Sequence, residues 1–309
     1  MSVRVGVIGV GYLGKHHARI LSKMSGVTLV GVVDRNLGRA TEIASEYGAR
    51  PSLDPRELMG KVDAVTIAVP TELHHEVALP FLSAGVPALV EKPLAKDLDE
   101  ADGLIAAAAR AGAALAVGHT ERFNPAVAVA REHLTEPRFI EVHRLGVFPE
   151  RSLDIDVVFD VMIHDLDVIL SLVNSEVDSI DAVGIPVLTK RVDIANVRVK
   201  FKNGCLAILT ASRISRDRVR KIRFFQPEAF LSIDYAAQKV EKFTLSRLLG
   251  IPRIDGGEIP VTNEEPLARE LADFVDAVRS KRPPMVDGAQ GRRALALAKA
   301  ITDKITTIS

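Results

Sequence analysis

The chain has 309 residues, of which 47% are apolar and 26% are charged, and 40 basic side chains balance 40 acidic ones. This length and balance are typical of a globular protein of two domains, and the zero net charge gives no field that favours nucleic acid or an anionic membrane. Cys205 is the lone cysteine, which excludes an intramolecular disulfide and a cysteine-based zinc site and predicts a cytoplasmic protein.

The chain begins with MSVRVGVIGVGYLG, a short apolar run that passes directly into a glycine pattern. The run has no cleavage signature, so we expect a first strand and not a signal peptide. No apolar run reaches ~18 residues, and we therefore expect no membrane-spanning helix.

Residues 1–120 alternate short apolar runs with helical patterns. The apolar runs are VRVGVIG, VTLVGVVD, DAVTIAVP, PALVEKP and AALAVGH, and amphipathic stretches such as NLGRATEIASEYG and LDEADGLIAAAARAG separate them. Continuous apolar strands that alternate with helices indicate a parallel sheet covered on both faces. We therefore predict a doubly wound α/β domain of the Rossmann type over residues 1–120.

Residues 121–309 have a different pattern. ERFNPAVAVAREHL and VVFDVMIHDLDVILSLV are predicted helices, and they are followed by long strand-like runs that include VDIANVRVKFKNGCLAILTAS, where FKNGC signals a tight hairpin. LLGIPRIDGGEIP is predicted to be a loop, and two amphipathic helices close the chain at roughly 263–281 and 287–307. The pattern predicts an α+β domain with a largely antiparallel open-faced sheet, which binds substrate and forms oligomers.

A glycine-rich turn follows the first strand in VIGVGYLGKHH. Gly9, Gly11 and Gly14 form the G-x-G-x-x-G pattern, and we predict that they contact a dinucleotide together with the intervening Val10, Tyr12 and Leu13. The first glycine permits a tight turn, the second lets the backbone approach a pyrophosphate, and the third lets helix and strand pack closely. The alternative is a glycine-rich turn without a ligand.

Asp34 stands twenty residues after Gly14, at the end of the second predicted strand. An acid at this position accepts hydrogen bonds from the adenosine ribose and repels a 2′-phosphate, which favours NAD over NADP. Arg35 works against this preference, because an adjacent arginine can pair with the phosphate of NADP.

The segment GVPALVEKP places Glu91 and Lys92 at the end of a predicted core strand. Carboxyl ends of parallel strands line the ligand crevice, so both residues are expected near the nicotinamide. Pro93 restricts Lys92 to an extended backbone conformation and thereby fixes the direction of its side chain. The alternative is a surface ion pair in a loop.

FDVMIHDLD in the second half contains Asp160 and His164, which are four positions apart and share a helix face. Their neighbours are apolar, and an acid and a histidine within such a helix are costly unless they pair or serve a site. The pattern alone leaves open a core histidine held by Asp160.

Taken together, the glycine turn, the acid after strand two, AVPTELHHEVALPFLSAG and the EKP segment resemble the Gfo/Idh/MocA oxidoreductases over essentially the full length. The resemblance implies dehydrogenation of a sugar, inositol or related compound with a dinucleotide. It also implies that Lys92 is catalytic, that the Lys92–Pro93 peptide is cis, and that Asp160 and His164 form the family's Asp-x-x-x-His pair. No metal is implied.

Further contacts are predicted with the alternatives still open. Pro70, Thr71 and His74 follow DAVTIA and are expected near the nicotinamide ribose, although His74 could be an ordinary residue at the start of a helix. Arg122 and Asn124 in GHTERFNPA are expected at the substrate, although Arg122 could instead cap the linking helix through an ion pair.

Basic residues are concentrated in RISRDRVRKIRF. From this segment Arg218 and Arg220 are predicted to bind substrate, together with Arg151, which precedes the catalytic helix, that is, the predicted helix with Asp160 and His164. Arginine forks suit phosphate, but a charged edge strand that deters aggregation is the alternative. The segment and the catalytic helix resemble the subgroup that oxidises UDP-N-acetylglucosamine at C3 for lipid A precursor synthesis.

Two other functions remain open from the sequence. One is dehydrogenation of an uncharged polyol such as inositol, which needs no arginine cluster. The other is a non-catalytic, dinucleotide-sensing regulator on the same fold. VDIANVRVKF and GCLAILTAS also carry apolar residues that we assign to both strand faces, which predicts a homodimer or homotetramer formed through the second-domain sheet.

Overall fold

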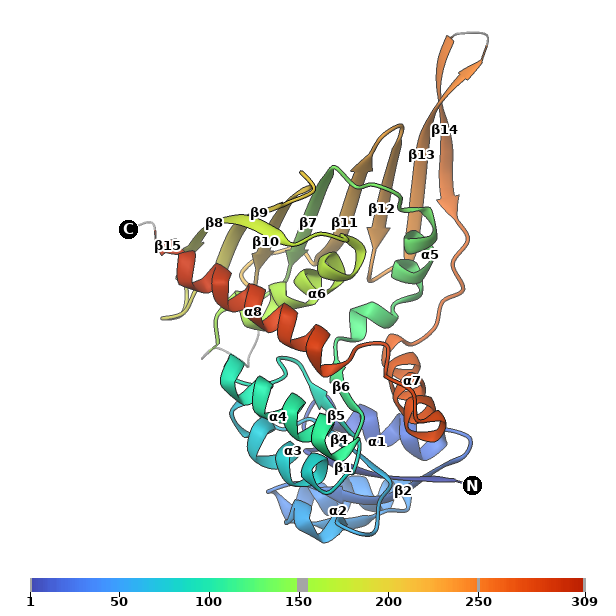
Figure 1. The fold of residues 1–309 in the computed structure, drawn as a ribbon, viewed down its shortest axis with the longest axis vertical. Helices are drawn as coiled ribbons and strands as arrows, with labels where there is room; N and C mark the ends of the chain where they lie inside the picture. Colours follow the sequence, from blue (N-terminus) through green and yellow to red (C-terminus); the bar gives the residue numbers. More distant parts are fainter. Residues whose placement is uncertain (1, 149–154, 249–250, 308–309) are drawn as a thin grey trace. The chain divides into compact units, whose positions relative to one another are not determined.

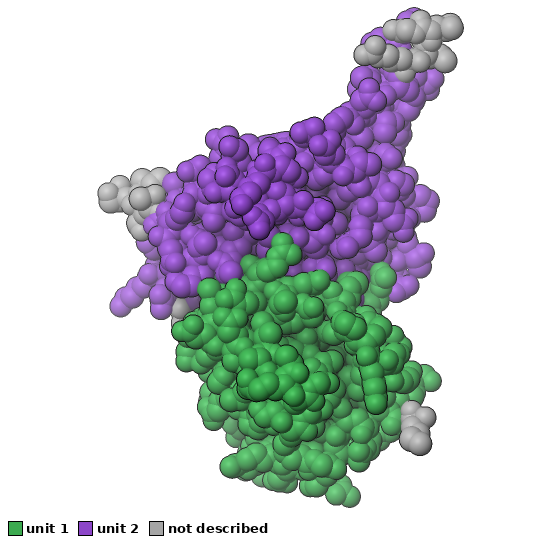
Figure 2. Space-filling model, viewed as in Figure 1, with its two compact units in different colours: residues 1–120, 265–295 green, residues 121–264, 296–309 purple. Residues whose placement is uncertain are grey.

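The computed structural model describes residues 2–148, 155–248 and 251–307. The chain divides into two compact units, coloured separately in Figure 2. Unit 1 contains residues 1–120 and 265–295, and unit 2 contains residues 121–264 and 296–309. The sequence analysis had assigned all of residues 121–309 to the second domain, whereas residues 265–295 group with unit 1.

Unit 1 has the alternation of strands and helices that the sequence predicts (Figure 1). Its elements are β1 (Val3–Ile8), α1 (Gly14–Lys23), β2 (Val27–Val33), α2 (Leu37–Tyr47), β3 (Arg50–Ser52), η1 (Pro55–Leu58), β4 (Ala64–Ile67), η2 (Thr71–Leu73), α3 (His74–Ser83), β5 (Ala88–Glu91), α4 (Leu98–Ala111), β6 (Leu115–Gly118), α7 (Pro266–Ser280) and the first half of α8 (Gly288–Lys304).

The six strands of unit 1 form a parallel sheet in the order β3-β2-β1-β4-β5-β6. From β1 the chain moves outward first through β2 and β3, and then the other way through β4, β5 and β6. Right-handed crossovers therefore place α1 and α2 on one face and α3 and α4 on the other, and α1 packs against α2 while α3 packs against α4. The predicted Rossmann fold is confirmed.

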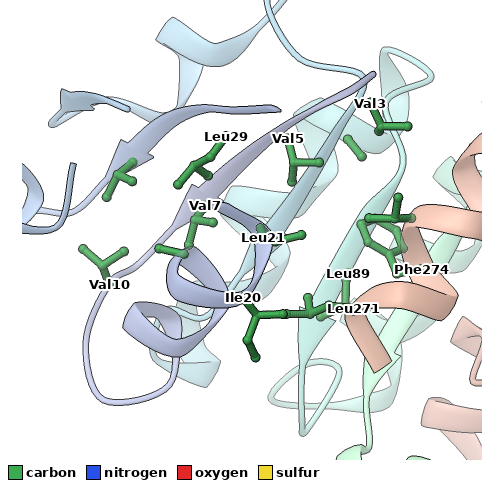
Figure 3. Packing of buried hydrophobic residues seen from close by; sticks show 14 of the residues in the cluster. Val3, Val5, Val7, Val10, Ile20, Leu21, Leu29, Leu89, Leu271 and Phe274 are labelled. Carbon is green, nitrogen blue, oxygen red and sulfur yellow. The ribbon is translucent and has the colours of Figure 1, made fainter. Parts of the chain in front are cut away.

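The core of unit 1 explains why α7 belongs to it. Leu271 and Phe274 of α7 are buried with Ile20 of α1 and Leu89 of β5 (Figure 3). Because these partners come from segments more than 180 residues apart in the chain, no local sequence pattern shows the contact. Burying two such side chains stabilises the unit by roughly 1.5–3 kcal/mol each.

Unit 2 is built from a second, larger sheet with helices (Figure 1). Its elements are η3 (Thr120–Phe123), which starts at the boundary between the units, α5 (Pro125–His133), β7 (Phe139–Leu145), the π-helix η4 (Val158–Met162), α6 (Ile163–Leu172), β8 (Val177–Ile185), β9 (Ile194–Phe201), β10 (Leu206–Ser212), β11 (Val219–Gln226), β12 (Ala229–Asp234), β13 (Lys239–Leu248), β14 (Ile251–Ile259), the second half of α8, and β15 (Thr306–Thr307).

The nine strands of unit 2 run in the order β14-β13-β12-β11-β7-β10-β9-β8-β15. Only the β7–β10 and β8–β15 pairs are parallel among the described residues, so the predicted, largely antiparallel sheet is confirmed. The hairpin signal FKNGC joins β9 to antiparallel β10, with Gly204 at φ +87° in the turn.

The two faces of this sheet differ in character, because side chains alternate along each strand. On β9 the buried face consists of Ala195, Val197, Val199 and Phe201. The other face of β9 carries half-buried Ile194 and exposed Asn196, Arg198 and Lys200, so the expectation of apolar residues on both faces was wrong for most of this strand. On β10 it holds in part, since Leu206 and Ile208 are half-buried on the second face.

The predicted loop LLGIPRIDGGEIP was wrong for most of its described residues, because Leu248 ends β13 and Ile251–Ile259 form strand β14, which pairs antiparallel with β13. Gly256 and Gly257 lie within the strand at φ +152° and +157°, and a Cβ on Gly256 would lie 2.0 Å from the carbonyl oxygen of Lys242. Pro252 is tolerated because β14 is the edge of the sheet. In this segment, therefore, the glycines allow two strands to approach closely and the proline indicates an edge strand. The sequence analysis assigned no element to β13.

Within the described ranges, no helix combines the length and apolar character needed to cross a membrane. The same residues contain no group of three or more histidine, cysteine, aspartate or glutamate side chains that could hold a metal ion.

Candidate active site

The glycine turn of unit 1 has a backbone that only glycine permits. Gly9 has φ +82°, and a Cβ there would lie 2.7 Å from the Ala68 carbonyl oxygen. A Cβ on Gly14 would lie 1.7 Å from the Gly9 carbonyl oxygen, so Gly14 lets α1 start against the turn. Around Gly11, in contrast, a Cβ would meet no described atom within 4 Å. The turn is therefore tight at its two ends and open at its centre.

The start of α1 is suited to an anion. No side chain caps the helix through a hydrogen bond at Leu13 in the described part of the chain, and the first-turn N–H groups are the ones that a helix leaves without internal partners. These donors and the positive end of the helix favour a phosphate. The residues present thus fit the pyrophosphate of a dinucleotide.

Asp34 follows β2 directly and is only 7% exposed. Its Oδ2 accepts a hydrogen bond from the Val10 N–H at 3.0 Å, and its Oδ1 accepts one from the Asn36 N–H at 2.9 Å. The carboxylate is thereby fixed against the glycine turn. Each oxygen has a second lone pair with which it could accept from a ribose hydroxyl.

A cleft of about 400 Å³ lies at the glycine turn, and its lining includes Gly11, Tyr12 and Arg39. Tyr12 is 60% exposed, and the Arg39 guanidinium lies 3.7 Å from Asp34 Oδ2. Arg35 is exposed. Sequence reasoning missed Arg39, which places a second arginine near the acid that was expected to select NAD.

His74 is buried at the start of α3. Its Nδ1 lies 2.8 Å from the Pro93 carbonyl oxygen and its Nε2 lies 2.9 Å from the Val69 carbonyl oxygen. Burial lowers the pKa of this imidazole, although the two carbonyls and Glu91 oppose that shift. This geometry favours a role in holding two loops together, and the expected cofactor contact of His74 stays a prediction, as do those of Pro70, which is exposed, and Thr71, which is half-buried.

Glu91, Lys92 and Pro93 lie at the carboxyl end of β5, as the sequence predicts. The Lys92–Pro93 peptide bond is cis. Lys92 is half-buried, whereas Glu91 is only 5% exposed. One carboxylate oxygen of Glu91 lies 3.1 Å from Nε2 of His17, and the other accepts the Lys92 N–H at 3.2 Å. The sequence analysis did not single out His17.

In unit 2, Asp160 and His164 lie where two kinds of helix meet. Asp160 is in the π-helix η4 and His164 is in the first turn of α6, and both side chains are half-buried. Single π-turns within α-helices are frequent at functional sites. The predicted uninterrupted α-helix is thus a π-turn followed by an α-helix.

Buried ion pairs hold the helix that carries His164. Asp165 accepts hydrogen bonds from Nε and Nη2 of Arg144 on β7, and the Nη1 of Arg144 donates to Glu121 at 3.0 Å. Sequence reasoning missed Arg144 because nothing local links a strand arginine to an acid 21 positions later. A buried, bidentate pair fixes geometry as well as charge.

Arg122 and Asn124 were expected at the substrate. Arg122 is buried and its Nη1 donates to Asp167 at 3.2 Å. Asn124 is the N-cap of α5, where its Oδ1 accepts the Ala126 N–H, and its Nδ2 donates to the Tyr235 carbonyl oxygen. These contacts favour structural roles for both residues, although Arg122 pairs with α6 and does not cap the linking helix. Their substrate contacts stay predictions.

The basic segment does not act as one cluster. Arg213 is buried on Asp193, Lys221 pairs with Asp234, and Arg223 pairs with Glu141. Arg218 and Arg220 are exposed, and Arg220 shares its strand face with buried Ile222 and Phe224. Lys221 and Arg223 lie on the other face. Arg151 lies outside the described residues.

The fold and these residues define a dinucleotide-binding oxidoreductase. Residues 3–119 match the family model "Oxidoreductase family, NAD-binding Rossmann fold", and residues 128–228 match the GFO/IDH/MocA C-terminal domain. The chain belongs to the Gfo/Idh/MocA family of dehydrogenases, as the resemblance predicted, and the regulator alternative is set aside.

Named relatives cover nearly the whole chain. UDP-N-acetylglucosamine 3-dehydrogenase of Acidithiobacillus ferrooxidans is 40% identical over 301 residues, which are 96% of this chain and 95% of the relative. A solved structure of that enzyme has TM-score 0.92 and 37% identity, and the match covers 99% of this chain and 98% of that one. Inositol 2-dehydrogenase of Rhizobium meliloti is 27% identical over 326 residues, with 97% and 96% coverage.

Proposed function

We propose that the protein oxidises a secondary hydroxyl of a nucleotide sugar to a ketone with NAD, the substrate being UDP-N-acetylglucosamine and the position C3. The observation that supports it most is the full-length similarity to a UDP-N-acetylglucosamine 3-dehydrogenase. The 3-keto product is suited to an aminotransferase, which fits the lipid A precursor synthesis implied by the sequence.

The proposed reaction converts the carbinol and NAD⁺ into the ketone, NADH and a proton. A bound nicotinamide supplies the acceptor for the hydride that leaves the carbinol carbon. The Gly9–Gly14 turn and Asp34 hold the dinucleotide, through backbone N–H groups at the pyrophosphate and a carboxylate at the ribose.

The proton chemistry is assigned to three side chains. We assign His164 as the base that takes the hydroxyl proton, because imidazole is suited to proton transfer near neutral pH. Asp160, four positions earlier, orients the ring and stabilises the imidazolium. Lys92 donates a hydrogen bond to the oxygen on which negative charge develops.

A substrate panel with NAD tests this function. UDP-N-acetylglucosamine, free N-acetylglucosamine and myo-inositol are each offered with NAD or NADP, NADH or NADPH absorbance is followed, and hydroxylamine traps the ketone. We expect turnover with the UDP-sugar and NAD, and little with the free sugar, which is the matched control for the nucleotide.

A second substrate class is favoured by one observation. Half of the six basic side chains in the arginine-rich segment are paired with acids of unit 2, which reduces the charge available for a diphosphate. An inositol-type polyol needs no such charge. Faster turnover of myo-inositol than of the UDP-sugar would replace the nucleotide-sugar proposal with this one.

A further inference from the structure

Two buried histidines hold the segment that contains Lys92, and each comes from a different helix. His17 of α1 contacts the Glu91 side chain, and His74 of α3 lies 2.8 Å from the Pro93 carbonyl oxygen. The Glu91 side chain, which the sequence predicts near the nicotinamide, is thus held by α1. These contacts raise the question of what the Glu91 carboxylate does for the lysine beside it.

The Glu91 carboxylate links α1 to the Lys92 backbone. His17 has no exposed surface, and its Nε2 lies 3.1 Å from Glu91 Oε1. Glu91 Oε2 accepts the Lys92 N–H at 3.2 Å. Within the described residues, Nδ1 of the His17 ring has no hydrogen-bond partner, whereas Nε2 lies against the Glu91 carboxylate. Because an ionised carboxylate only accepts hydrogen bonds, the ring proton that makes this bond is on Nε2.

Glu91 keeps its negative charge in this buried place. Burial alone would raise the pKa of its carboxyl, but the hydrogen bond and charge of His17, together with Lys92, hold that pKa below its ordinary value. The titratable groups that act on Glu91 are His17 from α1, His74 from α3 and Lys92 itself. A carboxylate next to an amine favours the ammonium form of that amine.

The sheet also leaves space for this carboxylate. Gly118 of β6 lies directly against it, and a Cβ on Gly118 would lie 2.9 Å from the carboxyl carbon and from Oε2 of Glu91. A larger residue at position 118 would therefore push the carboxylate away from its two hydrogen bonds. Three elements, α1, β5 and β6, thus fix one buried negative charge.

We propose that His17 and Glu91 are a positioning pair for Lys92. His17 fixes the Glu91 carboxylate, which holds the Lys92 amide and keeps the lysine side chain cationic, so that it donates to the substrate oxygen while another group takes the proton. This inference rests on the proposed catalytic role of Lys92. It assigns neither His17 nor Glu91 a contact with substrate or cofactor.

Labelling of Lys92 tests the charge part of the proposal without any substrate. Trace acetic anhydride reacts with the neutral amine, and mass spectrometry of the Lys92 peptide across a pH series gives the midpoint of its deprotonation. In Glu91→Gln we expect this midpoint to fall by about one pH unit or more, because an adjacent carboxylate is lost. Glu57→Gln, which removes an exposed acid of unit 1, should leave it unchanged.

Kinetics test the positioning part. His17→Asn and Glu91→Gln should each lower kcat by about 10- to 100-fold, the scale for a misplaced reacting group. The dissociation constant of NADH, measured by fluorescence, should stay within about twofold. His133→Asn, which alters a histidine of α5 outside the proposed site, is the control. If His17→Asn does not fold, the nearly isosteric Glu91→Gln and the labelling midpoint still decide the question.

The outcomes separate this inference from the function on which it rests. An unchanged labelling midpoint together with wild-type kcat in Glu91→Gln would overturn the positioning pair. Normal turnover in Lys92→Ala would instead overturn the catalytic role of the lysine, and the labelling midpoint would still show whether Glu91 sets its charge.

Discussion

At the scale of single residues, the assignment of Lys92, Asp160 and His164 predicts a pattern of kinetic losses. Lys92→Ala and His164→Ala should each lower kcat by roughly 10²-fold or more, the scale of a positioned acid–base group. Asp160→Asn should lower it less, because the histidine remains while its charge support weakens. Steady-state kinetics with the best substrate of the panel measure this, and NADH binding should be unaffected.

His133→Ala supplies the control for that series, because this histidine lies in the last turn of α5, outside both catalytic segments. Near-normal turnover in His164→Ala would make that histidine structural and leave Lys92 to act without it.

The choice between NAD and NADP is also a matter of single residues. Asp34→Ala should weaken NAD binding more than NADP binding, because the ribose loses its acceptor and Arg39 no longer lies beside a carboxylate. Calorimetric titration of both cofactors measures the ratio. Asp63→Ala, which removes an exposed acid paired with Arg4, is the control. A preference for NADP in the unmutated protein would contradict the role of Asp34.

The exposed arginines give a third prediction at this scale. Arg220→Ala and Arg218→Ala should raise KM for a UDP-sugar severalfold with little change in kcat, because a remote phosphate contact binds ground state and transition state alike. Arg223→Ala is the matched control, since this residue of β11 faces the other side and pairs with Glu141. If all three variants have the KM of the unmutated protein, the segment is a charged surface that does not contact the substrate.

At the scale of elements, the sequence predicted an element correctly wherever the polarity of its side chains follows a local pattern. The five predicted parallel strands are present, and so is the β9–β10 turn, because apolar runs and Asn203–Gly204 determine them. β14 was missed because Gly256 and Gly257 are also typical of loops, and short β3 was missed because three residues show no period.

The same reasoning explains which site residues were found. The glycine turn, Asp34 and Lys92 stand in motifs that can be identified in one segment. The pairs that hold them depend on distant partners: His17 and Glu91 are 74 positions apart, and Arg144 and Asp165 are 21 apart. Such contacts exist only once the fold brings the elements together, so the sequence alone did not reveal them.

Asp193 connects several elements and gives a stability prediction. Its carboxylate accepts N–H groups of Val187, Leu188 and Thr189 at 2.7–2.9 Å, and the Nε of buried Arg213 at 2.8 Å. Arg213 also donates to the Ile155 carbonyl oxygen, shortly before the π-helix that contains Asp160. Asp193→Asn should therefore destabilise the fold by roughly 3 kcal/mol or more at neutral pH, measured by urea unfolding.

The effect of Asp193 should depend on pH. Burial alone would raise the pKa of its carboxyl, but the backbone N–H groups and Arg213 hold it well below its ordinary value. The folded state thus gains stability above the unfolded pKa of about 3.9 and loses it as pH falls further. The gap between wild type and Asp193→Asn should shrink below about pH 4. The exposed pair Arg4–Asp63 is the control, and Asp63→Asn should cost about 1 kcal/mol or less.

At the scale of the whole molecule, the face of the unit 2 sheet that bears Arg223 carries a row of aromatic side chains. Phe139, Phe225, Phe230 and Phe243 lie on adjacent strands β7, β11, β12 and β13, with ring centroids 5.5, 5.1 and 6.1 Å apart. Strands β13 and β14 extend beyond their neighbours in the sheet (Figure 1), and Leu245 and Ile254 continue the apolar row there, 41% and 74% exposed.

This row revises the argument for assembly. The sequence analysis based it on β9 and β10. The second face of β9 is largely polar and that of β10 carries only Leu206 and Ile208 as apolar residues, whereas aromatic residues gather on β7 and β11 to β13. An apolar surface continued along a projecting hairpin is typical of a contact between proteins, and a second copy of the same sheet offers the same aromatic row to pair with. We therefore still expect a homodimer or homotetramer formed through this face.

Light scattering at micromolar concentration tests that expectation. The unmutated protein should have a mass of two or four chains, and Phe225→Glu or Phe230→Glu should shift it towards one chain, because each buries a charge in an apolar contact without a partner. Leu37→Glu, which alters an exposed apolar residue of α2 in unit 1, should leave the mass unchanged. Circular dichroism shows whether each variant is folded. A strictly monomeric mass in the unmutated protein would mean that the aromatic row stabilises only its own sheet. Ring pairs with centroids 5.1–6.1 Å apart already contribute roughly 0.5–1.5 kcal/mol each to the pairing of neighbouring strands.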